Sequence, residues 1–385
     1  MRILVLTKRQ YMGKDLLDDA YGRFYELPLE LAALGHEVRG VCASYRRREE
    51  GRFDRRSGGA EVSWHAVNVR PIAPWTLYRW AHAIERQIKS FKPDVLWACS
   101  DSFHAIVGAA FQSRHGVPCV VDLYDNFESY VGTAIPGVRP WFRASVRRAA
   151  GVTCVSRPLE RYVRAAYGVQ RPTMVLENGV SGDFRPLDRL ACRARFGLPE
   201  AAKIIGTAGA LDAGRGVEVL FQGFLRLAER RPDLYLLLAG RVGRDALIPV
   251  HPRVAHLGQL PLAEVPYVIG AMDVSVICNK RSAFGEYCFP QKLYEVIACG
   301  VPPLVANTSG VAELLERAPR NRYEPESVDS LVQGVEALLA APTMPAISPV
   351  SWKEHGARLE DFLAMHFTPA AQARALPPQR LRAVR

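Results

Sequence analysis

The sequence predicts an α/β protein of two Rossmann-like domains, each built on a parallel sheet, with the two domains facing a central cleft. Three observations support this fold class. Apolar runs of strand length alternate with segments of helical apolar spacing in both halves of the chain. The chain has 385 residues, more than one hydrophobic core usually holds. An arginine-rich stretch at residues 183–197 separates the two series and is the expected linker.

The first half opens with a strand. Residues 2–7 (RILVLT) form a continuous apolar run, which is typical of a parallel strand buried on both faces. After a polar loop at 8–19, residues 22–34 have helical apolar spacing. Residues 46–56 are dense in arginine and acid and are expected to form an exposed loop. The alternation is completed by strands at 38–43, 62–69, 93–99, 117–122, 151–156 and 174–176, and by helices at 73–91, 102–114, 141–150 and 158–167.

The second half repeats this alternation. A strand at 204–208 runs into a glycine-rich loop, and a helix at 217–230 follows. Further segments with strand or helix patterns lie at 235–240, 254–257, 263–271, 274–278, 291–299, 304–306 and 327–339. The predicted organisation is two domains at 1–180 and 181–350, an amphipathic helix at 351–368, and a basic tail at 369–385. The Pro, Ala and Arg content of that tail is typical of disorder.

The composition narrows the functional classes. Lys and Arg number 50 against 39 Asp and Glu, and a net charge of +11 favours phosphorylated ligands, anionic lipid or nucleic acid as partners. No apolar run reaches the roughly eighteen residues of a membrane span, and the short, strand-like N-terminus is not a secretory signal. The eight cysteines lack C-x-x-C spacing, so we expect free thiols in a reducing cytoplasm and no structural metal.

The helix at 73–91 has two interpretations. It carries Trp75, Leu77, Tyr78 and Trp80 close to several basic residues. One interpretation is a surface helix that packs its apolar face on the sheet. The other is a helix whose aromatic side chains lie at the headgroup level of a membrane while its bases meet anionic lipid.

Two loops of the second half have the composition of a phosphate site. Residues 209–216 (GALDAGRG) join a strand to a helix, their glycines permit close backbone approach, and Arg215 offers planar donors to a diphosphate. Residues 284–290 lead into a helix whose N-terminal amides and Lys292 suit an anion. Glu295 lies one turn after Lys292 on the same face and can accept hydrogen bonds from sugar hydroxyls. We therefore expect both loops to bind one nucleotide diphosphate.

In the first half, Asp125 follows the strand at 117–122. Ligands of open α/β sheets bind at the carboxyl ends of strands, so Asp125 is a site candidate. Glu128 is either a second candidate or a residue that caps a helix or is solvated in the loop.

The sequence resembles the nucleotide-sugar glycosyltransferases with the two-domain B-type fold, specifically the retaining family-4 enzymes of group 1. The resemblance extends to about Phe367 and suggests that the last helix crosses back onto the first domain. It is carried by residues 35–38 (GHEV), 177–180 (ENGV), 209–216, 238–240 (LAG), 309–313 (SGVAE) and, most specifically, 289–302 (FPQKLYEVIACGVP).

The resemblance implies roles for individual residues. Arg215 and Lys292 bind the donor diphosphate, and Glu295 holds the nucleotide ribose. The family's other acid, which contacts the donor sugar, falls at Tyr287 in this chain. Glu286, one residue earlier, takes that role here. The implied donor-binding residues are Gly209, Arg215, Gly216, Phe289, Lys292 and Glu295, and the implied catalytic residues are Asp125, Arg215, Lys292 and Glu286. The chain departs from the family at Ala210, often an arginine, and at Tyr124, where many members have a histidine.

The implied activity is transfer of a hexosyl group, with retention, from a nucleotide-diphosphate sugar to a cell-envelope glycan or lipid-linked sugar. It would need no cofactor and no divalent metal, since fixed positive groups stabilise the diphosphate. We expect a cytoplasmic protein at the inner face of a membrane. Three alternatives stay open: a sugar-nucleotide 2-epimerase of the same fold, a non-catalytic nucleotide-sugar-binding member, and a nucleic-acid-binding protein, the last resting on net charge alone.

Overall fold

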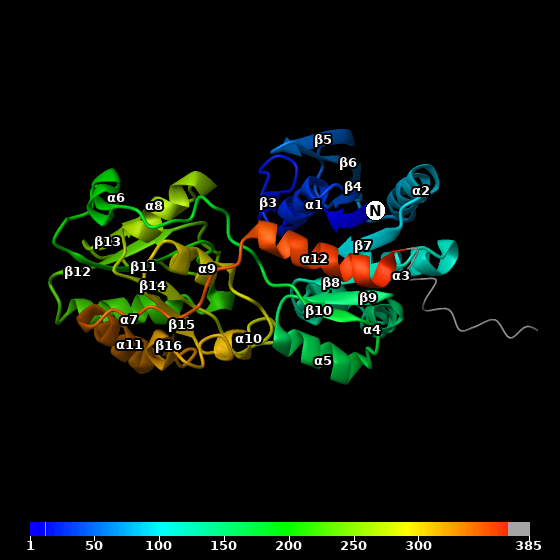
Figure 1. Ribbon diagram of the computed structural model, residues 1–385. Helices are drawn as coiled ribbons and strands as arrows, with labels where there is room; N and C mark the ends of the chain where they lie inside the picture. The colour runs from blue at the N-terminus through cyan, green and yellow to red at the C-terminus, as the bar shows by residue number, and fades with distance from the viewer. Residues whose placement is uncertain (12, 369–385) are drawn as a thin grey trace, which may run out of the picture. The chain divides into compact units, whose positions relative to one another are not determined.

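The computed structural model describes residues 1–11 and 13–368 and divides the chain into two compact units. The first unit comprises Met1–Glu177 and the chain from Trp352 onward, and the second comprises Asn178–Ser351. Each unit is an α/β structure around its own largely parallel sheet, which confirms the fold class (Figure 1). The expected tail at 369–385 lies outside the described residues.

The first unit holds an eight-stranded sheet in the order β10-β9-β8-β7-β1-β4-β6-β5. Neighbouring strands are parallel except β5, which runs antiparallel to β6. The strands are β1 (Arg2–Lys8), β4 (Glu37–Ser44), β5 (Gly51–Ser57), β6 (Ala60–Asn68), β7 (Val95–Cys99), β8 (Cys119–Leu123), β9 (Gly151–Cys154) and β10 (Thr173–Val175). A short hairpin, β2 (Gln10–Tyr11) with β3 (Lys14–Asp15), lies inside the expected loop after β1.

The expectation of an exposed loop at 46–56 was wrong in part, because β5 occupies Gly51–Ser57. This segment is rich in arginine and mostly exposed, which hid its strand character from an apolar pattern. It is the edge strand of the sheet, and charge on such a strand discourages pairing with another chain. Arg52 and Arg56 on β5 pair with Asp54 and Glu61.

Helices cover both faces of the first sheet. They are α1 (Arg23–Ala33), α2 (Pro74–Phe91), α3 (Ser102–His115), α4 (Val138–Arg148), α5 (Arg157–Tyr167) and α12 (Trp352–Phe367). Helix α1 connects β1 to β4, whereas α2 and α3 connect strands in the opposite direction along the sheet. Because parallel crossovers are right-handed, α1 therefore lies on the opposite face of the sheet from α2 and α3. The last helix, α12, packs against α1 (Figure 1).

The contact between α1 and α12 is close. A Cβ atom added to Gly356 would lie 2.5 Å from the Cβ of Glu30, so only glycine permits this approach of the two helices. Leu359 and Leu363 of α12 are fully buried. The chain therefore completes the core of its first unit with its last helix.

A buried ion pair lies beneath α1. The guanidinium of Arg23 donates two hydrogen bonds to Asp122, of 2.8 and 2.9 Å, and both side chains are 0% exposed. The hydroxyl of Thr153 donates a third bond to Asp122, at 2.5 Å. Such a pair is stable only when its remaining lone pairs are satisfied, and here they are. It fixes the first helix to the centre of the sheet.

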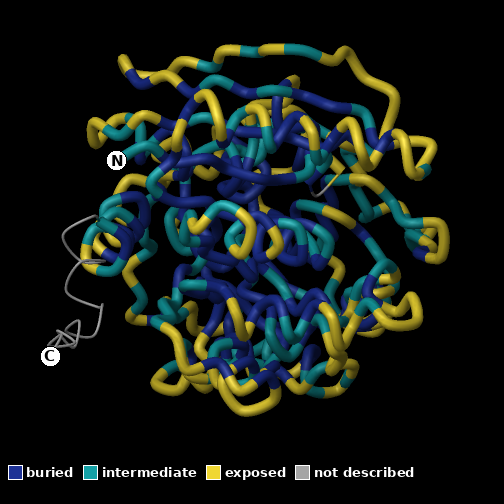
Figure 2. Tube along the Cα trace, turned by 90° about the vertical axis from the view of Figure 1, so that its right-hand side faces the viewer, coloured by how far each residue is buried: buried dark blue, intermediate teal, exposed yellow. Residues whose placement is uncertain are grey.

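The second unit holds a six-stranded parallel sheet in the order β13-β12-β11-β14-β15-β16. The strands are β11 (Lys203–Ala208), β12 (Leu234–Ala239), β13 (Val254–His256), β14 (Val274–Ile277), β15 (Pro303–Ala306) and β16 (Arg322–Tyr323). The helices are α6 (Arg189–Arg195), α7 (Glu218–Ala228), α8 (Val265–Gly270), α9 (Gln291–Ala298), α10 (Ser309–Ala312) and α11 (Val328–Ala340). Figure 2 shows the buried stretches of the trace surrounded by exposed loops.

The stretch at 183–197 is not a free linker. It includes α6, which packs against α8 within the second unit. Cys192 and Arg193 are buried, and the guanidinium of Arg193 donates to Asp273 at 2.7 Å and to the Ala271 carbonyl at 3.2 Å. The arginine content that suggested a linker instead serves to attach this helix.

Candidate functional site

The candidate site lies at the carboxyl edge of the second sheet. Strands β11 and β14 are neighbours and parallel, so the loops that follow them start at the same edge. The first loop, residues 209–217, leads into α7, and the second, residues 278–290, leads into α9. The order of the strands thus brings together two segments that are about seventy residues apart in the sequence.

The two loops meet at Gly209 and Lys292. A Cβ atom on Gly209 would lie 2.4 Å from Cε and 2.6 Å from Nζ of Lys292, so any larger residue would displace the ammonium group. Gly209 also has a φ of +120°, which side chains rarely adopt. Two features therefore require glycine at this position: the positive φ of its backbone and the closeness of the Lys292 side chain.

Arg215 and Gly216 form a second contact between the loops. The Arg215 guanidinium lies over the ring of Phe284, 4.9 Å from its centroid. A Cβ atom on Gly216 would lie 3.0 Å from Cγ of Lys280, which belongs to the loop after β14. Arg215 is thus held by an aromatic face and keeps its planar donors for an anion.

The positive charges of the two loops act on each other. Burial, followed by the neighbouring Arg215 charge, lowers the pKa of Lys292 to about 8 from an ordinary 10.5. The ammonium is therefore still protonated near neutral pH. An anion bound beside it would stabilise this charged form. This arrangement, two cations and a glycine-rich turn at a strand end, is suited to a diphosphate.

Glu295 lies one turn along α9 from Lys292 and is 7% exposed. Its Oε1 accepts a hydrogen bond from Nε2 of Gln291 at 2.9 Å. Burial raises its pKa to about 7, against the opposing effects of Lys292 and Gln291. A carboxyl group that titrates near neutrality beside a buried lysine is unusual for a purely structural position.

Phe289 and Glu286, which the resemblance assigns to the donor, make contacts within the second unit. The Phe289 ring is buried against Tyr294, with centroids 4.8 Å apart, and its carbonyl accepts from Nδ2 of Asn178 at 3.4 Å. Only its backbone is therefore available to a ligand. Glu286 accepts from the Ser309 amide at 2.9 Å and also from the Ser309 hydroxyl. Its carboxylate anchors the loop to the start of α10.

Asp125 lies in the first unit, at the carboxyl edge of that sheet. Its Oδ2 is 2.9 Å from the hydroxyl of Tyr130, which is also 2.9 Å from the hydroxyl of Tyr124. The Lys8 ammonium donates to the Tyr124 hydroxyl at 3.0 Å and to the Ser100 carbonyl at 3.2 Å. The strand ends of β1, β7 and β8 thus form one polar cluster around Tyr124.

Lys8 was missed at the sequence level. Burial lowers its pKa, while the nearby Asp101 and Asp125 oppose that shift. The signal was present, because Lys8 ends the first buried strand and the strand-end rule that selected Asp125 applies equally to it. Glu128, the other candidate, is structural: it accepts from Arg143 at 2.5 and 3.0 Å and from Tyr162 at 2.8 Å.

Two family models match the chain. The model described as "Glycosyl transferase 4-like domain" matches residues 23–179, and the model described as "Glycosyl transferases group 1" matches residues 202–341. Together they match well over half of the chain, one in each unit. The chain belongs to the group 1 glycosyltransferases.

Curated relatives carry related names. A D-inositol 3-phosphate glycosyltransferase from Segniliparus rotundus is 25% identical over 219 residues, covering 52% of this chain and 47% of the relative. One from Stackebrandtia nassauensis is 29% identical over 223 residues, covering 51% and 48%. WcaI of Escherichia coli K12, provisionally named as a colanic acid biosynthesis glycosyl transferase, is 24% identical over 356 residues, covering 81% and 86%. The matches to the first two span about half the length of those relatives.

Solved structures share the fold. Sucrose-phosphate synthase from Thermosynechococcus elongatus has a TM-score of 0.72 at 17% identity, covering 97% of this chain and 96% of that chain. HepE from Anabaena, solved in complex with UDP, has a TM-score of 0.67 at 17% identity, covering 98% and 100%. At these identities the likeness shows the fold, which is the B-type fold of glycosyltransferases.

Proposed function

We propose that this protein transfers a hexosyl group from a nucleotide-diphosphate sugar to a cell-envelope glycan or lipid-linked sugar, with retention of configuration and without a divalent metal. The observation that supports it is the contact between the two loops of the second unit, where Lys292 lies over Gly209 beside Arg215. The family membership supports the reaction class. HepE solved with UDP-glucose supports a nucleotide-sugar donor, and the name of WcaI supports an envelope glycan.

The proposed mechanism follows from where charge develops. As the bond between the sugar and the diphosphate loosens, negative charge grows on the leaving phosphate, and fixed cations at that point favour the transition state over the bound donor. Arg215 and Lys292 would provide this charge. The acceptor hydroxyl would give its proton to the departing phosphate on the same face of the sugar, which retains the configuration. Asp125, held by Tyr130, would orient the acceptor.

The donor site is tested by thermal shift with UDP, GDP and ADP sugars. We expect one nucleotide to raise the melting temperature of the wild type, and Arg215→Ala and Glu295→Ala each to lose that response. Arg226→Ala is the matched control, because Arg226 is an exposed arginine of α7 that pairs with Asp329. An unchanged response in both site variants would contradict the proposed site.

The reaction is tested with the stabilising donor and an acceptor pool of envelope glycans or lipid-linked sugars. The anomeric configuration of the product, read by NMR, is expected to match that of the donor, and a chelator is expected to leave the rate unchanged. Inversion at the anomeric carbon would contradict retention. Interconversion of the sugar nucleotide without acceptor would instead indicate the 2-epimerase.

We also propose peripheral binding of the first unit to an anionic membrane on its cytoplasmic side. Among the described residues, no helix has the length and apolar content to span a bilayer. Ile72, just before α2, and Trp75 and Tyr78 in its first turns are 70%, 64% and 70% exposed. Sedimentation with vesicles of phosphatidylcholine and phosphatidylglycerol should fall at least severalfold in Trp75→Ala/Tyr78→Ala, since aromatic side chains favour the headgroup region. Equal sedimentation of variant and wild type would contradict the proposal.

A further inference from the structure

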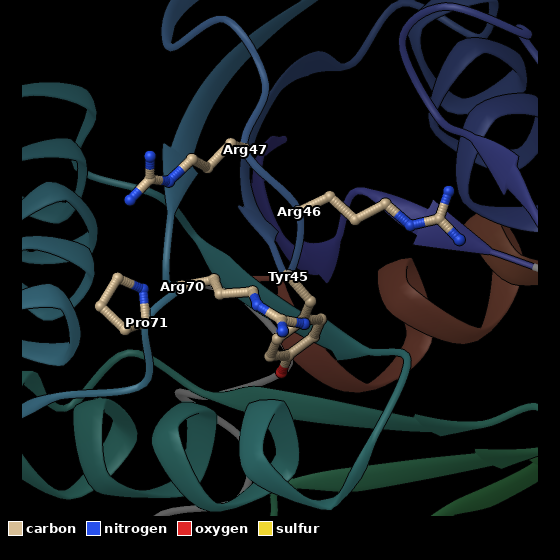
Figure 3. A pocket seen from close by; sticks show the side chains of 5 residues that line it. All are labelled: Tyr45, Arg46, Arg47, Arg70 and Pro71. Carbon is tan, nitrogen blue, oxygen red and sulfur yellow. The ribbon is translucent and has the colours of Figure 1, made fainter.

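A surface cavity of about 410 Å³ lies in the first unit, at the carboxyl ends of β4 and β6 (Figure 3). These two strands are neighbours and parallel, so the cavity opens at the sheet edge where Lys8 and Asp125 also lie. The cavity is lined by Tyr45, Arg46, Arg47, Arg70 and Pro71. Its volume is within the range of pockets that hold small ligands, about 300–1,000 Å³.

The three arginines of this cavity have no partner among the residues that the structure describes: their guanidinium groups make no hydrogen bond or ion pair there. In Figure 3, Arg46 and Arg47 extend to opposite sides of their loop and Arg70 extends toward Tyr45. Nearby arginines differ, because Arg48, Arg52 and Arg56 each face a carboxylate, of Asp15, Asp54 and Glu61. Arg46, Arg47 and Arg70 thus place three positive charges, without a carboxylate partner in the described part of the chain, around one cavity, which favours an anion there.

The wall of the cavity is fixed by hydrogen bonds. The Tyr45 hydroxyl donates to Oδ2 of Asp101 at 3.0 Å, and Oδ1 of Asp101 lies 2.7 Å from Nδ1 of the buried His104. Asp101 also contributes to the electrostatic environment of Lys8. A ligand seated on Tyr45 therefore lies beside the polar cluster of Lys8, Tyr124 and Asp125 rather than on an unrelated surface.

We propose that this cavity binds a phosphate or diphosphate group carried by the acceptor. Guanidinium groups match phosphate oxygens in geometry and charge, and a diphosphate carries enough negative charge to offset three of them. The apolar Ile72 follows Pro71 directly and is exposed, so an acceptor with an apolar part next to its phosphate has a surface to contact. The inference rests on the proposed function, since it supplies the chemistry of the acceptor.

The test is calorimetric titration of the full chain with inorganic pyrophosphate at low salt. The pocket variant is Arg46→Gln/Arg47→Gln/Arg70→Gln, and the matched control is Arg48→Gln/Arg52→Gln/Arg56→Gln, which removes the same charge from paired arginines. The donor site is disabled separately by Arg215→Ala. We expect Arg215→Ala to retain one pyrophosphate site, which the pocket substitutions weaken at least tenfold and the control substitutions do not.

The outcomes separate the two hypotheses. If the pocket substitutions leave pyrophosphate binding by Arg215→Ala unchanged, or if the control substitutions weaken it as much, the acceptor-phosphate pocket is refuted. If Arg215→Ala itself changes nothing while the pocket substitutions abolish all binding, the proposed donor site fails and the pocket stands.

The source of the phosphate is distinguished by two further probes. Binding of a hexose 1-phosphate that the pocket substitutions abolish would indicate a soluble sugar phosphate. Sedimentation with vesicles containing phosphatidic acid, lost in the pocket variant and kept in the control, would indicate a lipid-borne phosphate. If the pocket variant and the control variant bind hexose 1-phosphate equally and sediment equally with the vesicles, the assignment to an acceptor is overturned.

Discussion

At the scale of single residues, Lys292 shows how a fold can hold a charge ready for an anion. Its ammonium lies over Gly209, and burial, followed by the neighbouring Arg215 charge, lowers its pKa to about 8. Neither residue gains from the other, because like charges repel. Glu295 opposes this effect in part, and a bound negative group would offset the remaining cost, which is why we assign the pair to a ligand.

This pair predicts a pH dependence of diphosphate binding. The folded-state pKa of Lys292 is below its ordinary value, so its charge is lost as the pH rises through about 8, and an anion that needs this charge then binds less tightly. Affinity of the preferred nucleoside diphosphate, titrated between pH 7 and 9.5, should be flat at first and then fall.

Lys292→Met serves as the control for that titration. It should bind the nucleoside diphosphate on the order of tenfold or more weakly at pH 7, because a charged hydrogen bond contributes about 1.5–3 kcal/mol, and it should lack the fall in affinity that the wild type shows above pH 8. The assignment would be contradicted by a variant with the same pH profile as the wild type.

At the scale of elements, strands and helices with strong apolar patterns were predictable from sequence. The buried run of β1, the helical spacing of α1 and the segment of α9 before its Gly300 terminus were all expected within a residue or two. The misses have a common cause. β5 and α6 are arginine-rich and are held to other segments by an ion pair of Arg56 with Glu61 and by the hydrogen bonds of Arg193, which an apolar pattern cannot reveal.

The candidate site was predictable to the same extent. The convergence of the loops carrying Gly209 and Lys292 was expected because both follow strands of one domain, and the structure brings these residues together. The anchoring of Glu286 to Ser309 and the burial of the Phe289 ring did not, since they depend on packing between loops. The polar cluster at Lys8 required knowing which strands are neighbours in the sheet.

The contact of α1 with α12 gives a prediction at this scale. Gly356→Val should destabilise the first unit by roughly 1–3 kcal/mol, because its side chain would enter the space of Glu30 and force the helices apart. Chemical denaturation of the full chain measures this change. Lys353→Ala, on the exposed face of the same helix, should stay within about 0.5 kcal/mol of the wild type. Equal stability of Gly356→Val and Lys353→Ala would show that the helices are not in close contact.

At the scale of the whole molecule, the two units have separate cores and the second is continuous in sequence, whereas the first is not. Chains with two cores often unfold in more than one step. In scanning calorimetry we expect two transitions, of which only that of the second unit moves upward with the donor nucleotide.

The size of that shift can be given. At a ligand concentration a hundred times Kd, binding adds about 2.7 kcal/mol, which corresponds to roughly 5–10 °C for a unit of this size. Arg215→Ala should abolish the shift and leave the other transition in place. A single transition that moves as a whole, or a shift confined to the first unit, would contradict the placement of the donor site.

The discontinuity of the first unit also bears on how the protein is made. Translation proceeds from the N-terminal to the C-terminal side, yet the helix that covers α1 is Trp352–Phe367. A ribosome must therefore finish the entire second unit before the first can close, and during that interval the surface of α1 against which Leu359 and Leu363 later pack is open to solvent. Chaperones or rapid synthesis must therefore keep this surface from aggregating until the last helix leaves the exit tunnel.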